Sequence, residues 1–146
     1  MKHTFLYQEG VWKANGIFSD ENRQDIEVNG QMDIRHVKNS WIAESFLEMQ
    51  LKEPVQIMNR YQIDVPETEQ PFLSWTALNM ALGPTKGHFV VVGDTIFSLF
   101  QTSDGQRGSE SFRKIDDQHY HNKGFLIEND KVVSCWEIGW KKNNAE

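Results

Sequence analysis

The chain has 146 residues, of which 38% are hydrophobic and 25% are charged, and its formal net charge is −6 at pH 7. This length fits a single domain, and the composition is too apolar and too rich in aromatic residues for a disordered chain. The 15 lysines and arginines are scattered singly rather than gathered in a basic stripe. Nucleic acid and anionic membranes are therefore not expected as partners.

The sequence also lacks signals for disulfides, secretion and membrane insertion. Cys135 is the single cysteine, so no internal disulfide can form. The apolar run in "MKHTFLYQEG" is too short for a signal peptide, and no run of about 18 apolar residues could span a membrane. We expect a soluble, cytoplasmic protein with one domain over residues 1–140 and a polar C-terminal tail over residues 141–146.

Two segments in the first half show the alternation of a β-strand. Over residues 26–36 one face is apolar except for its last residue, His36, and the other face is polar. Over residues 55–65 the apolar face also carries Asn59 and Tyr61. Successive side chains of a strand point to opposite faces, so each segment predicts a half-buried antiparallel strand. The apolar residues expected to point inward are Val28, Met32, Ile34, Ile57 and Ile63.

Two other segments fit a strand less cleanly. Residues 40–54, "SWIAESFLEMQLKEP", have a composition that favours helix, but most of their apolar residues fall on one strand face and the other face is mostly polar. Residues 71–84, "PFLSWTALNMALGP", also allow a short helix, because Leu73, Ala77 and Met80 have helical spacing. We predict strands for both because their neighbours are strands. A short helix that closes one barrel end stays open for the second segment.

The second half contains further β-rich runs separated by short turns. The turns are Gly93–Asp94, "SDGQRG", "NKG" and "NDK", in which Gly, Asn and Asp tolerate positive φ. Such short connections leave no room for crossover helices, so sequence neighbours should pair antiparallel. We therefore predict an all-β, antiparallel up-and-down barrel of about nine or ten strands, with at most one or two short helices. Which face points inward stays open for residues 72–82, 95–102 and 132–140.

This strand pattern resembles that of the calycins, the lipocalin-like and fatty-acid-binding-protein-like barrels. The resemblance covers nearly the whole chain as a pattern, but it rests on no motif, since "GVW" at Gly10 lacks the spacing of the lipocalin GxW signature. It implies an up-and-down barrel that binds a small hydrophobic molecule. It assigns no role to any single residue.

The stretch "DDQHYHNKG", residues 116–124, raises the question of a metal site. In a strand His119 and His121 would share a face, and two imidazoles can bind one metal ion if a third ligand exists. The alternative is a short solvated strand between two turns, the second at Asn122–Gly124. We prefer this alternative, so we expect no metal ion and no cofactor, with Tyr120 pointing into the barrel.

Polar residues on otherwise apolar faces are candidates for ligand contacts. Asn59 and Tyr61 could hydrogen-bond a ligand, or they could make internal hydrogen bonds that fix the strand register. His36 could act as an acid or base at the barrel mouth, or it could be a hydrogen-bonded rim residue. The five tryptophans are mostly packing residues, with one or two expected in a cavity wall. The predicted ligand-binding residues are His36, Asn59, Tyr61, Glu110, Tyr120 and Trp136.

Two carboxylates lie on faces of mixed character, Glu110 beside Phe112 and Glu137 beside Cys135. A surface position is the alternative for both. If one of them points inward it needs a partner, because an unpaired buried charge is costly, and Arg60 or Arg113 could supply it.

Two classes of function remain after these exclusions. No phosphate loop, dinucleotide fingerprint or GxSxG nucleophile motif is present, and Cys135 lacks the setting of a nucleophile. The first hypothesis is a binder of a small, uncharged or weakly anionic apolar molecule inside the barrel. The alternative is a cofactor-free isomerase, cyclase or decarboxylase that uses Tyr, His and Glu in the cavity. A filled barrel that serves only as an interaction module is a third possibility.

Overall fold

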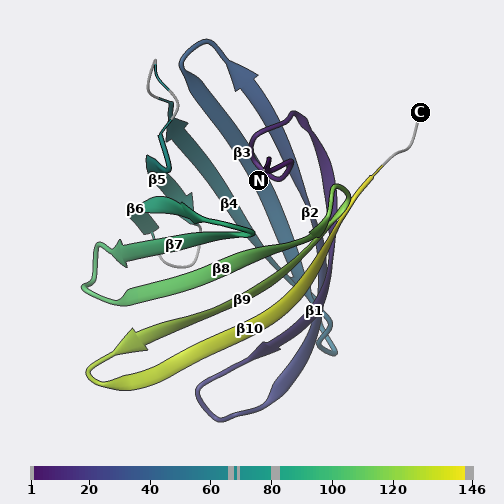
Figure 1. The fold of residues 1–146 in the computed structure, drawn as a ribbon. Helices are drawn as coiled ribbons and strands as arrows, with labels where there is room; N and C mark the ends of the chain where they lie inside the picture. The colour runs from purple at the N-terminus through teal and green to yellow at the C-terminus, as the bar shows by residue number, and fades with distance from the viewer. Residues whose placement is uncertain (1, 66–67, 69, 80–82, 144–146) are drawn as a thin grey trace.

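The computed structural model describes residues 2–65, 68, 70–79 and 83–143. These residues form ten β-strands that close into a barrel, in which each strand pairs antiparallel with its sequence neighbours and β1 pairs with β10 (Figure 1). The strands are β1 (Gly10–Ser19), β2 (Asp25–Val37), β3 (Ser40–Met49), β4 (Val55–Asp64), β5 (Phe72–Asn79), β6 (Gly83–Val92), β7 (Thr95–Thr102), β8 (Arg107–Asp116), β9 (His119–Glu128) and β10 (Lys131–Lys142).

This architecture confirms the predicted all-β meander. Strands β2 and β4 begin and end within one residue of the predicted segments 26–36 and 55–65. The ambiguous segment 71–84 forms β5 and the first residues of β6, so its helical spacing is not used in the described part of the chain. Met80, which completed that spacing, lies outside the described residues.

The two ends of the barrel differ in what covers them. At one end, which we call the plugged end, lie the β2–β3, β4–β5, β6–β7 and β8–β9 connections. The N-terminal segment, residues 2–9, lies at this end, and the chain leaves β10 here as well (Figure 1). At the opposite end, which we call the far end, β1, β3, β5, β7 and β9 end and the strands that follow them begin.

The N-terminal segment supplies core side chains, which sequence analysis did not foresee. Phe5 is fully buried, and its ring lies 4.8 Å from that of Phe112 and 5.3 Å from that of Trp12, measured between ring centroids. The rings of Tyr120 and Trp140 lie 5.4 and 6.0 Å away. Aromatic pairs at such separations add to the free energy gained by burial. This aromatic cluster closes the plugged end from within.

One predicted turn is wrong. Residues Asn122–Gly124 lie within β9 rather than in a turn, although Asn, Lys and Gly have turn-like composition. The reason is packing: the indole of Trp136 lies over Gly124, where a Cβ atom would come 2.3 Å from Cε2 of that ring. Asn122 is buried and hydrogen-bonded inside the barrel. The glycine therefore provides room for a neighbouring ring, and not positive φ for a turn.

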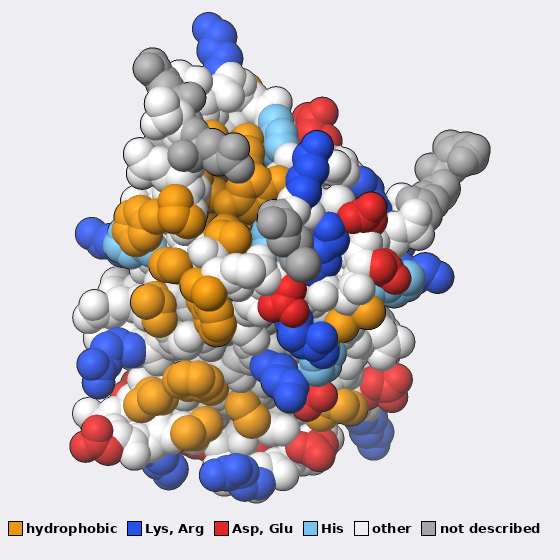
Figure 2. Space-filling model, in the orientation of Figure 1, with side chains coloured by type: hydrophobic (Ala, Val, Ile, Leu, Met, Phe, Trp, Pro, Cys, Tyr) orange, Lys and Arg blue, Asp and Glu red, His pale blue; other side chains and the backbone are white. Residues whose placement is uncertain are grey.

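The outer surface mixes apolar and charged side chains. Figure 2 shows several separate groups of apolar side chains on one face, with lysines, arginines and carboxylates between them. The most exposed of the large apolar residues, such as Leu78 and Val92, come from β5 and β6.

β10 continues to Lys142, two residues into the segment expected to be a tail. In the described residues, no helix is long and apolar enough to cross a membrane.

Candidate functional site: the barrel cavity

The side chains that point inward leave an empty space in the barrel. Its volume is about 270 Å³, close to the lower end of the roughly 300–1,000 Å³ typical of small-molecule sites. All ten strands contribute to its lining, and Phe5 and Leu6 close it at the plugged end. The lining is mainly apolar, with a small number of polar groups among aliphatic and aromatic side chains.

The inner faces of β2 and β4 point as predicted. Val28, Met32 and Ile57 line the cavity, whereas Ile34 and Ile63 are buried in the core. For the described residues, the structure also decides the faces that sequence analysis left open; residues 80–82 of the first open segment lie outside the described part of the chain. Along β5 the odd-numbered residues point inward, and along β7 the even-numbered residues do. From Ser134 to Trp140 in β10, the inward residues are Ser134, Trp136, Ile138 and Trp140.

Glu110 is the acidic group of the cavity. It lies on β8 between Ser98 of β7 and Gly124 of β9 in the strand register. Its Oε1 accepts hydrogen bonds from Nδ2 of Asn122 at 3.0 Å and from Nε1 of Trp136 at 3.2 Å. Both bonds go to the same oxygen, and in the described chain no hydrogen bond reaches Oε2. The carboxyl group is therefore held in place while one of its oxygens remains available to a bound molecule.

Burial raises the pKa of Glu110 above its ordinary value of 4.5, against the opposing effect of the hydrogen bonds from Asn122 and Trp136. An inward carboxylate was expected to need an arginine partner, with Arg60 and Arg113 as candidates, but neither fills that role. Arg60 lies on the exterior with Nε 3.8 Å from Oε2 of Glu44, and Arg113 is exposed on β8. Burial therefore works against the ionised form of this carboxyl group, because a buried charge costs more than the neutral acid.

Tyr61 contributes a second titratable group to the same cavity. Its ring makes an edge contact with that of Trp75, at a centroid separation of 5.1 Å. Burial, followed by the charge of Glu110, raises the pKa of the Tyr61 hydroxyl above its ordinary value of 10.0. The hydroxyl makes no hydrogen bond to the part of the chain that the structure describes. Tyr61 therefore offers the cavity a neutral O–H group.

Further polar side chains inside the barrel are the Asn59–Asn79 pair and Ser98. Nδ2 of Asn79 donates a hydrogen bond to Oδ1 of Asn59 at 2.5 Å, and both residues line the cavity on neighbouring strands. Ser98 is fully buried opposite Glu110, and its Oγ has no hydrogen-bond partner among the described residues. Buried hydroxyls are usually satisfied, so the region around Glu110 has unused hydrogen-bonding capacity.

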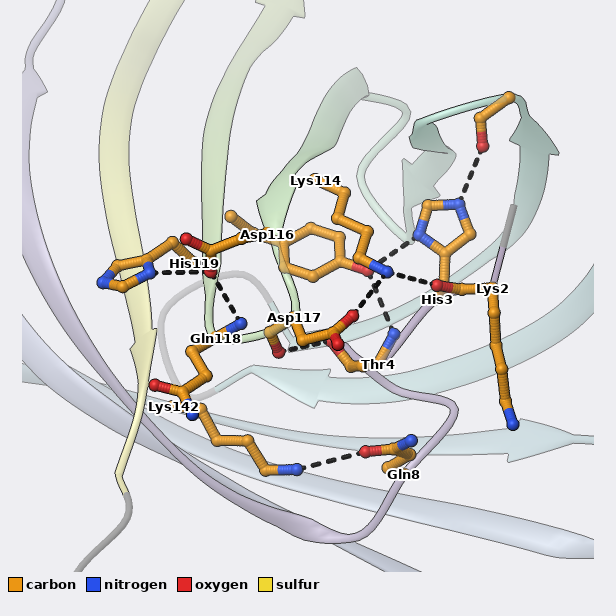
Figure 3. Close-up of polar contacts among 12 residues, drawn as sticks. Lys2, His3, Thr4, Gln8, Lys114, Asp116, Asp117, Gln118, His119 and Lys142 are labelled. Atoms are coloured by element: carbon orange, nitrogen blue, oxygen red, sulfur yellow. Dashed lines mark hydrogen bonds and ion pairs between the residues drawn. The ribbon is translucent and has the colours of Figure 1, made fainter.

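Tyr120 does not line the cavity, although it points inward as expected. Its hydroxyl lies 2.8 Å from Nδ1 of His3 and accepts a hydrogen bond from the backbone N–H of Thr4 at 3.1 Å (Figure 3). The carbonyl of Gly93 can only accept, so Nε2–H of His3 donates to it at 2.9 Å, and Nδ1 of the neutral ring then accepts from the Tyr120 hydroxyl. Desolvation lowers the pKa of His3, and the nearby charge of Lys114 adds to this effect. Tyr120 thus anchors the N-terminal segment.

Further polar contacts to the N-terminal segment come from the end of β8 and from the β8–β9 turn. Nζ of Lys114 donates to the carbonyl of Lys2 and lies 2.8 Å from Oδ1 of Asp117 (Figure 3). Oγ1 of Thr4 donates to the carbonyl of Asp117 at 2.7 Å. Hydrogen bonds to buried or charged groups are among the stronger ones in proteins. The N-terminal segment is therefore held at its start by polar contacts and further along by Phe5.

His36 also lies outside the cavity. Its Nε2 lies 2.8 Å from the carbonyl of Leu6, and its ring stacks on that of Trp41 at a centroid separation of 4.4 Å. This is the rim position that sequence analysis gave as the alternative. Of the six residues predicted to bind a ligand, the structure brings four together in the cavity wall: Asn59, Tyr61, Glu110 and Trp136. Their contact with a ligand stays a prediction.

The three residues of "HYH" alternate in direction along β9, with Tyr120 pointing inward and the two histidines outward. His119 and His121 are on the outer side of β9, and Nδ1 of His119 lies 2.8 Å from Oδ1 of Asp116. Nε2 of His121 lies 3.3 Å from Oε1 of Glu137, which is the exterior position given as the alternative for that carboxylate. No group of three or more potential metal ligands occurs among the described residues.

Sequence reasoning missed Asn122 and Asn79 as cavity residues. Asn122 is nearly fully buried, and besides its bond to Glu110 it accepts a hydrogen bond from Nε1 of Trp140 at 3.4 Å. A signal existed: in β9 it follows Tyr120 by two residues and so shares its inward face. The turn-like composition around it hid this signal.

Replacing Glu110 with glutamine should stabilise the protein more at high pH than at low pH. The raised pKa means that folding favours the protonated form of Glu110, so the contribution of this group to stability is fully present below pH 4.5 and is lost as pH rises through the folded-state pKa. Each unit of pKa difference corresponds to about 1.4 kcal/mol. Glutamine does not titrate and can keep the hydrogen bonds from Asn122 and Trp136. Urea unfolding of wild-type protein and Glu110→Gln, from below pH 4.5 to alkaline pH, measures the difference in their free energies of unfolding. A difference that does not change with pH would contradict the prediction.

Comparisons with known proteins agree on the fold. No protein-family model and no curated protein matches the sequence. The structure of the S-type phycobiliprotein lyase CPES from Guillardia theta aligns with a TM-score of 0.69 and 10% identity, over 97% of this chain and 92% of the lyase. Rv2717c from M. tuberculosis aligns with a TM-score of 0.72 and 11% identity, over 93% of this chain and 92% of that protein. With its closed meander of antiparallel strands, the chain has the calycin-like, lipocalin-type barrel fold.

Proposed function

We propose that this protein binds a small, largely apolar molecule inside its barrel. The observation that carries the proposal is the mainly apolar cavity of about 270 Å³ within a closed barrel. Protein interiors are normally packed without voids larger than a water molecule. A cavity of this size in the centre of the core therefore lowers stability unless a ligand fills it, and apolar walls exclude strongly hydrated ligands.

The polar groups of the cavity support a ligand with a polar end. Glu110, Tyr61 and the Asn59–Asn79 pair converge on one apolar space, as expected for a few groups that orient a bound molecule. The lyase named above has the same fold, which is compatible with a ligand-binding barrel. The proposal keeps the cytoplasmic location expected from the sequence, where the free thiol of Cys135 would stay reduced.

Calorimetric titration with naphthylmethanol, a neutral apolar probe, tests the proposal. Burying about 200 Å² of apolar surface contributes roughly 5 kcal/mol before ordering costs, which alone corresponds to a Kd of about 0.2 mM. We expect hydrogen bonds in the cavity to tighten this to no better than about micromolar, with a stoichiometry near one. A negative heat-capacity change should accompany binding. Asn59→Leu and Tyr61→Phe should change the affinity, because both residues line the cavity. Absence of saturable binding, or binding that neither substitution affects, would contradict the proposal.

A cofactor-free enzyme of the isomerase, cyclase or decarboxylase type is the second candidate. It is favoured by one observation, the presence of two titratable side chains, Glu110 and Tyr61, in the same cavity. A carboxyl group whose pKa burial raises can act as a general acid toward a bound molecule. Turnover of a bound compound that Glu110→Gln abolishes without loss of binding would select the enzyme over the binder.

A further inference from the structure

The polar lining of the cavity also restricts the chemical class of the ligand, which is an inference that rests on the proposed function. Two features decide it. Oε2 of Glu110 receives no hydrogen bond from the described residues, and the described lining of the cavity contains no positively charged side chain.

The first feature is the one-sided hydrogen bonding of Glu110. Asn122 and Trp136 both donate to Oε1, which leaves Oε2 without a partner in the described chain. The opposite residue, Ser98, cannot be reached by solvent, and its hydroxyl makes no hydrogen bond to the described residues. In the ionised carboxyl group, an oxygen that faces an apolar cavity without a donor is costly, and a donor on the ligand removes this cost.

The second feature is the charge that the ionisable side chains of the described lining can carry. Glu110 and Tyr61 can each carry negative charge, and no Arg, Lys or His occurs among the described residues that line the cavity. The nearby arginine of β4, Arg60, lies on the exterior, where it approaches Glu44. A ligand carboxylate would therefore be buried without a counter-charge, which is costly. It would also repel Glu110 and Tyr61 whenever either of them is ionised.

We propose that the bound molecule is an apolar amine, or a molecule with a comparable N–H donor, that presents its nitrogen to Oε2 of Glu110. A bound ammonium group favours the ionised form of Glu110 against the effect of burial, and the two together form a neutral pair, whose remaining hydrogen bonds come from Asn122 and Trp136. A charge-assisted hydrogen bond is about twice as strong as a neutral one. Apolar carboxylates, including fatty acids, are rejected by the same site.

A set of probes that share one ring system tests this inference. Naphthylmethylamine, naphthylmethanol, methylnaphthalene and naphthoic acid have nearly the same apolar body and differ in the head group. We expect the amine to bind wild-type protein roughly 10- to 100-fold more tightly than the acid near neutral pH. In Glu110→Gln this ratio should fall to within about threefold, because the acceptor charge is lost.

Glu137→Gln is the matched control, since Glu137 lies on the exterior of β10 and is exposed. It should leave the ratio of amine to acid affinity unchanged. Thermal unfolding of both variants establishes that they are folded before titration. An acid that binds wild-type protein as tightly as the amine overturns the inference but leaves the proposed function standing. A ratio that survives in Glu110→Gln also overturns it. Failure of all four probes to bind overturns the proposed function itself.

Discussion

Replacing Phe5 with alanine should lower the free energy of unfolding by about 3–5 kcal/mol, the cost typical of removing a buried aromatic ring. Phe5 is fully buried at the plugged end and contacts four aromatic rings, with Phe112 the nearest at 4.8 Å. The void left behind is framed by β-strands, which cannot collapse into it. The stability of the barrel therefore depends on a side chain that lies outside the strands, in the N-terminal segment, residues 2–9.

Phe97→Ala is the control for this experiment, because Phe97 lies on the outer face of β7 and is 40% exposed. Its removal should cost less than about 1 kcal/mol, as surface substitutions usually do. Urea unfolding of the two variants beside wild-type protein gives both values. Equal, small losses for Phe5 and Phe97 would mean that residues 2–9 do not close the barrel in solution.

The strand pattern allowed most of the fold to be predicted. Alternation with period two follows directly from strand geometry, and it identified β2 and β4 almost to the residue. Short polar connections then required neighbouring strands to pair, and a meander of this many strands avoids exposed edges by closing. These arguments need no knowledge of distant contacts, which explains why they succeeded.

Features that depend on contacts across the barrel could not be predicted in this way. The role of the N-terminal segment depends on where Phe5 and His3 meet the β6–β7 turn, β8 and β9, which are far from them in sequence. The turn predicted at Asn122–Gly124 failed for a related reason. Local composition there favours a turn, but the fit of Trp136 over Gly124 outweighs it.

The candidate site could likewise be predicted only in part, because strand alternation is visible in the sequence and contacts across the barrel are not. Strand alternation placed Asn59 and Tyr61 on the inward face, and the mixed face of Glu110 left its orientation undecided. The choice of Asn122 and Trp136, rather than Arg60 or Arg113, as its partners depends on the barrel register. A sequence can thus identify which polar residues face a barrel interior, but the hydrogen bonds that set their charge state come from strands distant in sequence.

Filling the cavity should abolish binding without unfolding the protein, and Ser45→Phe is the substitution that tests this. Ser45 lies on β3 between Met32 of β2 and Asn59 of β4 and lines the cavity. A phenyl ring at this position occupies space that is empty in the structure, so it need not displace neighbouring side chains. Its burial adds apolar contacts, and cavity-filling substitutions commonly raise stability by about 0.5–2 kcal/mol.

We expect Ser45→Phe to weaken binding of naphthylmethanol at least about tenfold, a loss of roughly 1.4 kcal/mol, with its unfolding temperature kept or raised. Ser74→Phe is the matched control, since Ser74 is exposed on the outer face of β5 and the same ring added there cannot reach the cavity. Calorimetric titration measures the affinities and thermal unfolding measures the stability. If both variants bind the probe as wild-type protein does, the probe is bound on the outer surface and the barrel interior is not the site.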